Sequence, residues 1–402
     1  NGKRYDFKSS FGGFCWIWRK LARSSLKYSN FDIMTEEQIL KALEAVMDPD
    51  LNRNIVELGF VQNLVIGEDN SVSMELVLTT PACPIRDRFK EQCERIILAL
   101  GASSAEVTLS AKAGRVSMPE VSESFLNDVT HIVAVASGKG GVGKSTVTAN
   151  LAVALSLSGA RVGILDADIY GPSMGVMFGI DQAPAVYEDK TISPVLARGG
   201  ISIVSMSMFS DSDRATIWRG PMASQMIKNF LHRVRWGTLD YLLVDFPPGT
   251  GDIQLTLTQE CPLSGAVVVT TPQEVALADC RKGLSMFDSV GVPVLGVVEN
   301  MSYFICDKCQ KEHYIFPQGG GERISKTFGV PLLGKIPMEA ALASCGDQGI
   351  PGVLYNPNSV SAEVFTQVAS EAVRKISVFA AMASESLSTF RYTFEELPEE
   401  SL

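Results

Sequence analysis

The chain has 402 residues, enough for roughly two or three domains that each bury a core of their own. Its formal net charge of −10 argues against non-specific binding of nucleic acid or of an anionic membrane surface, and its apolar runs are too short to span a bilayer. Eight cysteines spread over this length do not resemble the dense framework of a small secreted protein, so we expect thiols in a reducing compartment.

The two ends differ in charge from the rest of the chain. Residues 1–33 are basic, with serines and aromatics and with Asp6 as the single acid of the first thirty. This composition fits the tail of an organellar transit peptide and equally a disordered basic arm. Because the chain begins with Asn1 rather than Met, we expect that sequence precedes it. We expect residues 376–402 to be a solvated acidic tail.

Residues 34–113 are predicted to form a small α+β domain. Thr35 and Gln38 have the spacing of a capping box, which begins an amphipathic helix that ends before Pro49. We expect strands at Phe60–Ile66 and Ser73–Thr79 and a second helix at Pro84–Leu100, with Cys93 in the core. Serines and glutamates in residues 114–128 indicate a linker.

Residues 129–375 alternate short apolar runs with helical patterns. Near-continuous apolar strands separated by helices predict an α/β domain with a parallel sheet covered on both faces. The expected strands are His131–Ala136, Val162–Asp166, Ile201–Met206, Tyr241–Phe246, Ala266–Thr271 and Val294–Glu299.

A phosphate-binding loop follows the first of these strands. Residues 137–146 read SGKGGVGKST and match the P-loop pattern G-x-x-x-x-G-K-[ST] between a strand and a helix. Glycines let the backbone wrap a phosphate, and the helix N-terminus adds positive potential. Lys144 would neutralise the outer phosphates of ATP and Ser145 would offer its hydroxyl to Mg²⁺. The expected nucleotide-binding residues of the loop are Gly138, Gly140, Gly141, Val142, Gly143, Lys144, Ser145 and Thr146.

Lys139 makes the loop more specific. A second lysine early in the loop is typical of the deviant Walker A class, which includes the nitrogenase iron protein and the MinD and ParA proteins. In those families this lysine crosses a dimer interface to the partner's nucleotide, so ATP would bring two chains face to face. A solvated lysine is the alternative.

Polar side chains at the ends of later strands complete the predicted site. Asp166 and Asp168 end one strand, where an open sheet places its ligands. Asp168 would orient the attacking water, and Asp166 would support it or hold metal through water. Asp245 ends a Walker B strand near Mg²⁺, and residues 246–252 form either a switch loop or only a rigid turn. Asn300 follows a late strand, where the resembling families contact the base.

Two groups of thiols are candidate metal ligands. Cys306 and Cys309 form a C-x-x-C pair that suits Zn²⁺ or an iron–sulfur centre. One pair supplies half of four ligands, and a two-fold dimer would supply the other half. A zinc knuckle helped by His313 and an unmetallated redox pair are the alternatives. Cys83, at the N-cap of the helix that Pro84 begins, is a further iron–sulfur candidate or a buried thiol without chemistry.

Taken together, these motifs resemble the Mrp/ApbC family of iron–sulfur carrier ATPases over about residues 129–370. The first unit resembles the small domain of SufT- and PaaD-type assembly proteins, and the order of the two is similar to bacterial Mrp and to the plastid high-chlorophyll-fluorescence type of carrier. The motifs that carry the resemblance are Gly138–Thr146, Leu165–Ser173, Pro247–Asp252 and Val298–Tyr303 in the second unit, and Asp48–Asp50, Glu57–Gly59 and Thr80–Pro84 in the first.

The resemblance implies a homodimer with a labile [4Fe–4S] cluster bridged by Cys306 and Cys309 of each chain, with slow ATP hydrolysis. It implies upstream scaffold proteins and iron–sulfur apoproteins as partners, and it favours the plastid stroma over the mitochondrial matrix or cytosol. The plastid type generally has a further C-terminal domain and often lacks the C-x-x-C. The C-x-x-C site of this chain therefore looks more like that of bacterial Mrp. A ParA- or MinD-like positioning ATPase and a zinc-stabilised nucleotide switch are the rival functions.

Overall fold

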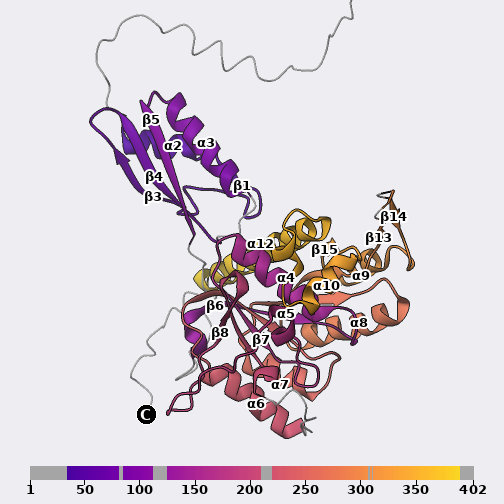
Figure 1. Ribbon diagram of the computed structural model, residues 1–402. Coiled ribbons are helices and arrows are strands. Elements are labelled where there is room, and N and C mark those ends of the chain that lie inside the picture. Colours follow the sequence, from indigo (N-terminus) through magenta and orange to yellow (C-terminus); the bar gives the residue numbers. More distant parts are fainter. Residues whose placement is uncertain are drawn as a thin grey trace, which may run out of the picture.

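The computed structural model describes residues 34–80, 85–111, 125–209, 220–306, 308–309 and 311–389. Figure 1 shows two packed units, a small one formed by the first described residues and a larger one built on a long sheet.

The small unit packs two helices on a three-stranded sheet. Strand β3 pairs antiparallel with β4, and β4 pairs parallel with β5. The predicted capping box is confirmed: Gln38 N donates to Thr35 Oγ1 at 3.3 Å, and Thr35 N donates to Gln38 Oε1 at 3.1 Å. Cys93 is fully buried among the apolar side chains, as predicted. The elements are α2 (Glu36–Leu43), β1 (Met47–Asp48), β2 (Arg53–Asn54), β3 (Val61–Ile66), β4 (Ser71–Leu78), α3 (Arg86–Ala99) and β5 (Ser104–Ala111).

The large unit contains an eight-stranded sheet in the order β15-β12-β11-β6-β10-β7-β9-β8. Its neighbouring strands are parallel except for β8, which pairs antiparallel with β9 at the edge. This arrangement confirms the predicted α/β fold. The strands are β6 (Val129–Ala136), β7 (Val162–Asp166), β8 (Val195–Ala197), β9 (Ile201–Ser205), β10 (Leu239–Asp245), β11 (Gly265–Thr270), β12 (Val294–Glu299) and β15 (Leu332–Lys335).

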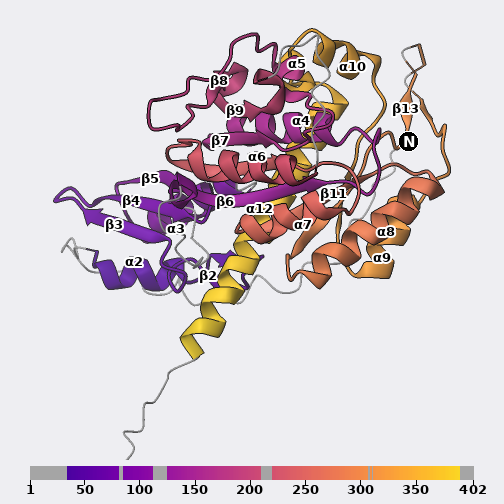
Figure 2. The ribbon, with the colours of Figure 1, turned by 90° about the horizontal axis from the view of Figure 1, so that it is seen from below.

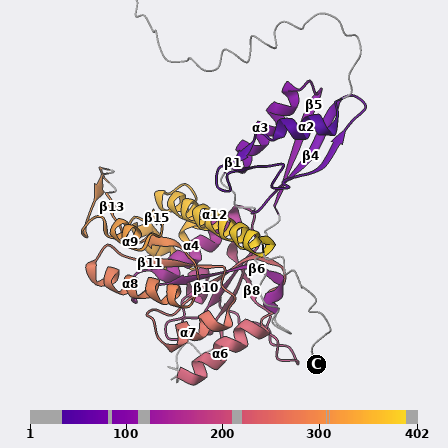
Figure 3. The same ribbon diagram turned by 180° about the vertical axis from the view of Figure 1, so that it is seen from behind.

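Helices cover both faces of this sheet because alternate residues of its strands point to opposite sides. On β6, Val133 and Val135 pack with α4 and α12, whereas Ile132 and Ala134 pack with α6, α7 and α8. Figure 1 shows α4 and α12 above the sheet and α6 and α7 below it, and Figure 3 shows the same layers from behind. The helices are α4 (Lys144–Leu157), α5 (Met174–Phe178), α6 (Gly220–Arg233), α7 (Asp252–Glu260), α8 (Glu274–Ser289), α9 (Gly320–Phe328), α10 (Ala340–Asp347), α11 (Gly352–Tyr355) and α12 (Val360–Thr389).

Helix α12 corrects the predicted start of the C-terminal tail. We expected a solvated tail from residue 376, but the helix continues to Thr389. Ile376 is buried and Phe379 packs against the same core, so the first residues of the expected tail belong to the folded unit. Within the described residues, no helix combines the length and the apolar character needed to cross a membrane.

Side-chain contacts join the small unit to the large one, among them a bond of 3.5 Å from Arg86 of α3 to the carbonyl of Ser158 at the end of α4. Thr80, just after β4, makes a buried hydroxyl contact of 2.8 Å with Tyr241 of β10. Thr79 lies 3.3 Å from Ser377 of α12. Arg374 of the same helix donates to Asp50 at 2.6 Å, and Figure 2 shows α12 running beside the small unit. The β4 end of the small unit is therefore held on the strand that leads to Asp245.

His131 of β6 contacts Tyr241, one of the residues of this junction. Its ring stacks on Tyr241 with centroids 5.6 Å apart, and its Nδ1 lies 3.3 Å from Ser264 Oγ. Burial lowers the pKa of His131 to about 4, against the opposing effect of Asp240. The imidazole is consequently neutral in the folded protein at neutral pH.

This histidine predicts an acid-sensitive stability. A group with a folded-state pKa of about 4 binds fewer protons than the unfolded chain, so its contribution is complete above pH 6.5 and is lost as pH falls toward 4. The loss by pH 4 is at most about 3 kcal/mol. His131→Gln should flatten the pH dependence of the unfolding free energy over this interval. An equal pH dependence in the wild type and the variant, measured by urea denaturation, would contradict the assignment.

Candidate functional site

The predicted P-loop lies between β6 and α4, and two of its glycines are required by close contacts. Gly143 has φ of 80°, and a Cβ there would lie 2.2 Å from the side-chain amide nitrogen of Asn300. A Cβ at Gly138 would lie 2.1 Å from the carbonyl oxygen of Asp279. Side chains at these positions would push the loop away from the sheet edge, so glycine is needed to hold the phosphate-binding backbone in place.

Lys144 and Asp245 form the centre of the site. Lys144 Nζ lies 2.7 Å from Asp245 Oδ2, and both side chains are buried. Ser145 Oγ donates to the same oxygen at 2.6 Å. Thr148 Oγ1 donates to Asp245 Oδ1 at 2.6 Å and also lies 3.0 Å from the carbonyl of Lys144. Side chains in the first two turns of α4 therefore neutralise the carboxylate that ends β10 and donate hydrogen bonds to it.

Asp166 lies directly beside Asp245, because the two are register partners on the parallel strands β7 and β10. Asp166 is fully buried and accepts hydrogen bonds from the backbone of Asp168, Ser173 and Met174 and from Ser205 Oγ. Burial, followed by the charge of Asp245, raises the pKa of Asp166. The Asp166 carboxylate thus holds the loop between β7 and α5 by hydrogen bonds, and this loop places Asp168.

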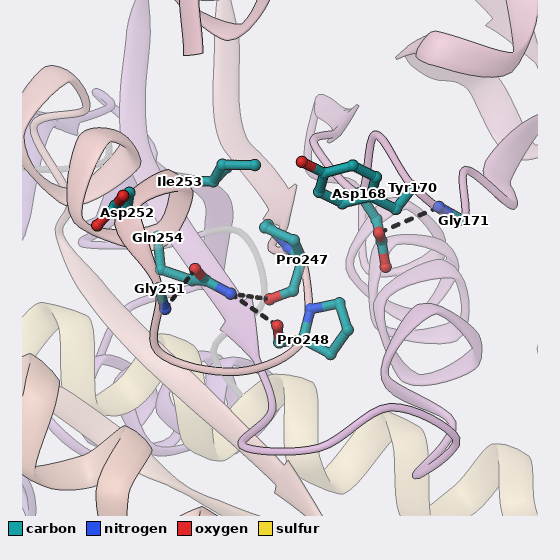
Figure 4. Close-up of a pocket in the computed structure, with 9 residues that line it drawn as sticks. All are labelled: Asp168, Tyr170, Gly171, Pro247, Pro248, Gly251, Asp252, Ile253 and Gln254. Carbon is teal, nitrogen blue, oxygen red and sulfur yellow. Dashed lines mark hydrogen bonds between the residues drawn. The ribbon is translucent and has the colours of Figure 1, made fainter. Parts of the chain in front are cut away.

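Asp168 lines a cavity of about 530 Å³ between the loop that follows β7 and the start of α7. Its Oδ2 lies 3.7 Å from Lys144 Nζ, and burial raises the pKa of the Asp168 carboxyl while Lys144 acts in the opposite direction. Figure 4 shows Asp168 and Tyr170 on one side of the cavity, the start of α7 on the other, and Pro247 and Pro248 between them.

Gln254 fixes the loop 246–252 on the far side of this cavity. Its Nε2 donates to the carbonyl oxygens of Pro247 at 3.1 Å and of Pro248 at 2.8 Å, and its Oε1 accepts from Gly251 N at 2.8 Å. The two prolines therefore present a braced loop to the cavity, as Figure 4 shows.

The remaining predicted nucleotide residues lie around the loop. Asn300 Nδ2 donates to the carbonyl of Val142 at 2.8 Å, so its amide braces the P-loop, and its contact with a base stays a prediction. Glu299, at the end of β12, is buried and accepts from Gly321 N and Ser302 Oγ, both at 2.6 Å. Lys139, near the start of the loop, is exposed.

The candidate metal ligands lie on a separate hairpin. Strands β13 (Phe304–Ile305) and β14 (Glu312–His313) form it, and Figure 1 shows it projecting beyond α9. One sulfur from each of Cys306 and Cys309 and one ring nitrogen of His313 lie within 4.8 Å of one another. The second candidate, Cys83, lies outside the described residues. Burial raises the pKa of Cys93, Cys261 and Cys280, and these thiols pack in the cores.

Sequence patterns did not reveal Thr148, Ser205 or Gln254. Each supports the site through a contact that joins residues of different elements or fixes a loop, and serine, threonine and glutamine have no motif at these positions. The available signal was a polar side chain on an otherwise apolar helix face: Thr148 is fully buried in α4.

Two family models match the chain. One is described as NUBPL iron-transfer P-loop NTPase and matches residues 128–373, and the other is described as iron–sulfur cluster assembly protein and matches residues 36–109. Both matches agree with the resemblance found from the motifs.

Among curated relatives, an iron–sulfur cluster carrier protein of Synechocystis is 47% identical over 87% of this chain and 99% of its own length. One of Escherichia coli with the same name is 41% identical over 82% of this chain and 89% of its length. The chloroplastic Fe–S cluster assembly factor HCF101 of Arabidopsis thaliana is 44% identical over 82% of this chain, which spans 62% of that protein. A nucleotide-binding protein of Archaeoglobus fulgidus, solved in complex with ADP, is 41% identical over 58% of this chain and 91% of its own, with a TM-score of 0.52.

The hydroxyl of Thr148 gives a direct test of the buried cluster. Thr148→Val keeps the side-chain shape but removes a donor to a charged, buried carboxylate, which should lower the unfolding free energy of the large unit by about 1.5–3 kcal/mol. Thr366→Val in α12 removes a hydroxyl that donates to the carbonyl of Ala362 in the same helix and should cost less than about 0.5 kcal/mol. Urea denaturation of the nucleotide-free proteins compares them; equal losses would show that the Thr148–Asp245 contact carries no special energy.

Proposed function

The chain belongs to the family of NUBPL-type iron-transfer P-loop NTPases, and we propose that it is an ATP-dependent carrier that binds a labile [4Fe–4S] cluster and transfers it to apoproteins. The observation that carries the proposal is the presence, in one chain, of an assembled P-loop site and of a projecting hairpin with two closely spaced thiols. Relatives named iron–sulfur cluster carrier protein, one of them matched over nearly its full length, support it.

The large unit would bind ATP with residues already in place. The backbone of the P-loop would surround the phosphates, and Lys144, 2.7 Å from Asp245, is the buried cation available to the outer ones. The oxygen donors of Ser145 and Asp245, 2.6 Å apart, suit Mg²⁺, with Ser145 binding the ion directly and Asp245 through water. Mg²⁺ would supply charge neutralisation at the phosphates.

Asp168 would orient the water that attacks the γ-phosphate. Asp168 lines the cavity, whereas Asp166 is bonded to backbone and to Ser205. Lys144 Nζ lies 3.7 Å from Asp168 Oδ2 and places a positive charge beside this carboxylate. Because one partly desolvated carboxylate would position the water, we propose slow hydrolysis.

A homodimer would complete the cluster site. Two thiolates from each chain supply the four ligands that a [4Fe–4S] cluster requires. Lys139 is exposed beside the nucleotide site, which supports its reaching a nucleotide on the partner subunit. Upstream scaffold proteins would load the cluster and iron–sulfur apoproteins would receive it.

For the compartment we propose the plastid stroma. The plant relatives that match 82% of this chain are named chloroplastic. Immunoblotting of plastid and mitochondrial fractions of the source cells tests this proposal.

The cluster site has a direct test. Cys306→Ser combined with Cys309→Ser should abolish iron and sulfide binding after anaerobic reconstitution, because serine oxygens are poor ligands for the iron of a cluster. ATP affinity should stay within about twofold, since the hairpin is separate from the P-loop. Iron and sulfide analysis, the visible absorbance and nucleotide titration measure both properties.

Cys345→Ala is the matched control, because Cys345 is buried in α10 away from the hairpin. This control should retain the full iron and sulfide content. A cluster that survives in the double variant, or that disappears equally in the control, would contradict the assignment to the hairpin.

A further inference from the structure

The β13–β14 hairpin places a histidine beside the two thiols. Phe304 lies directly opposite His313 in the antiparallel pair, and Cys306 N donates to the carbonyl of Lys311 at 3.0 Å, which continues the ladder. Because alternate residues of a strand share a face, Cys306 lies on the face of Phe304 and is a diagonal neighbour of His313. Cys309, in the turn, completes a group of three.

The spacing of this group fits one metal ion. The ligand atoms of Cys306, Cys309 and His313 all lie within 4.8 Å of one another. In a tetrahedral site with metal–sulfur bonds of about 2.3 Å and metal–nitrogen bonds of about 2.1 Å, neighbouring ligand atoms are about 3.5–3.8 Å apart. The separations exceed these values by at most about 1 Å, which rotation of two exposed side chains and one half-buried side chain can close.

The base of the hairpin is fixed while its tip is open. Met338 N donates to the carbonyl of Tyr303 at 2.7 Å, and Phe304 forms a bridge with Met338. The rings of Tyr303 and Tyr314 lie 6.1 Å apart across the strands. Cys309 and His313 are exposed, so an ion can enter from solvent without unfolding the hairpin.

We propose that Cys306, Cys309 and His313 of a single chain bind one divalent transition-metal ion of the Zn²⁺, Fe²⁺ or Co²⁺ class. Two thiolates balance the charge of the ion, and a neutral imidazole adds the third ligand. Three protein ligands leave the fourth tetrahedral position to water or to an exchanging ligand, unlike a closed structural zinc site. An open, exposed site of this kind suits an ion that is exchanged.

This site goes beyond the proposed cluster site because it requires only one chain. The two sites share both thiolates, so an ion in the first excludes a bridged cluster, and His313 has no place among four bridging thiolates. The role of His313 is therefore the feature that separates the two, and either proposal can fail without the other.

Co²⁺ titration of the full-length, nucleotide-free protein under anaerobic conditions is the test. The wild type should bind one Co²⁺ per chain, with thiolate-to-cobalt charge-transfer absorption, the intense visible bands of tetrahedral cobalt and an unchanged sedimentation coefficient. His313→Ala should weaken binding by at least about 10-fold and reduce the visible bands. His232→Ala, at a partly exposed histidine beside Glu260, is the matched control and should bind Co²⁺ as the wild type does.

A second readout identifies the nitrogen ligand. With ¹⁵N-labelled histidine, Zn²⁺ should shift the ring signals of one of the three histidines, the one that His313→Ala removes. Equal Co²⁺ affinity in wild type and His313→Ala, one ion per two chains, or an unmoved His313 ring would overturn the proposal. A wild type that binds Co²⁺ as expected but assembles no cluster would instead contradict the proposed dimeric cluster alone.

Discussion

The buried contact between Lys144 and Asp245 is the constraint on which the nucleotide site depends. A carboxylate with no exposure to solvent ends β10, and Asp166, also fully buried, is its register partner on β7. Two buried acids side by side are tolerated only with a cation and several donors around them. The α4 helix provides the cation and the hydroxyl donors to Asp245, whereas Ser205 and the backbone after β7 donate to Asp166. The helix can do so only when the P-loop places it at the sheet edge. Phosphate binding and core stability therefore rely on one arrangement.

The same strand connects this arrangement to the rest of the molecule. Tyr241 lies four residues before Asp245 on β10 and bonds Thr80 of the small unit, while Arg374 of α12 bonds Asp50. Helix α12 packs on α4, whose first turn contains Lys144 and Ser145. The small unit is thus attached to β10, which ends at Asp245, and to α12, which packs on α4.

Local patterns predicted the elements that carry strong local signals. The strands Val162–Asp166 and Val294–Glu299 and the capping box at Thr35 are as predicted, because apolar runs and capping side chains act within a few residues. Strand β5 and the edge strands β8 and β15 were missed, since a weakly apolar run such as Ser104–Ala111 becomes a strand only by pairing with β4. The bonds of Thr148 and Gln254 and the position of His313 beside Cys306 arise from tertiary packing, which no local motif encodes.

We propose that ATP pairs two chains and so brings four thiolates to one cluster. Sedimentation under anaerobic conditions with ATP, Mg²⁺, iron and sulfide, followed by iron and sulfide analysis of each fraction, is the sharpest test of this pairing. We expect about four iron and four sulfide ions per two chains in the dimer fraction. We also expect Lys139→Ala to shift the protein to single chains without cluster. Cluster bound to single chains, or a dimer that forms without regard to ATP and Lys139, would contradict it.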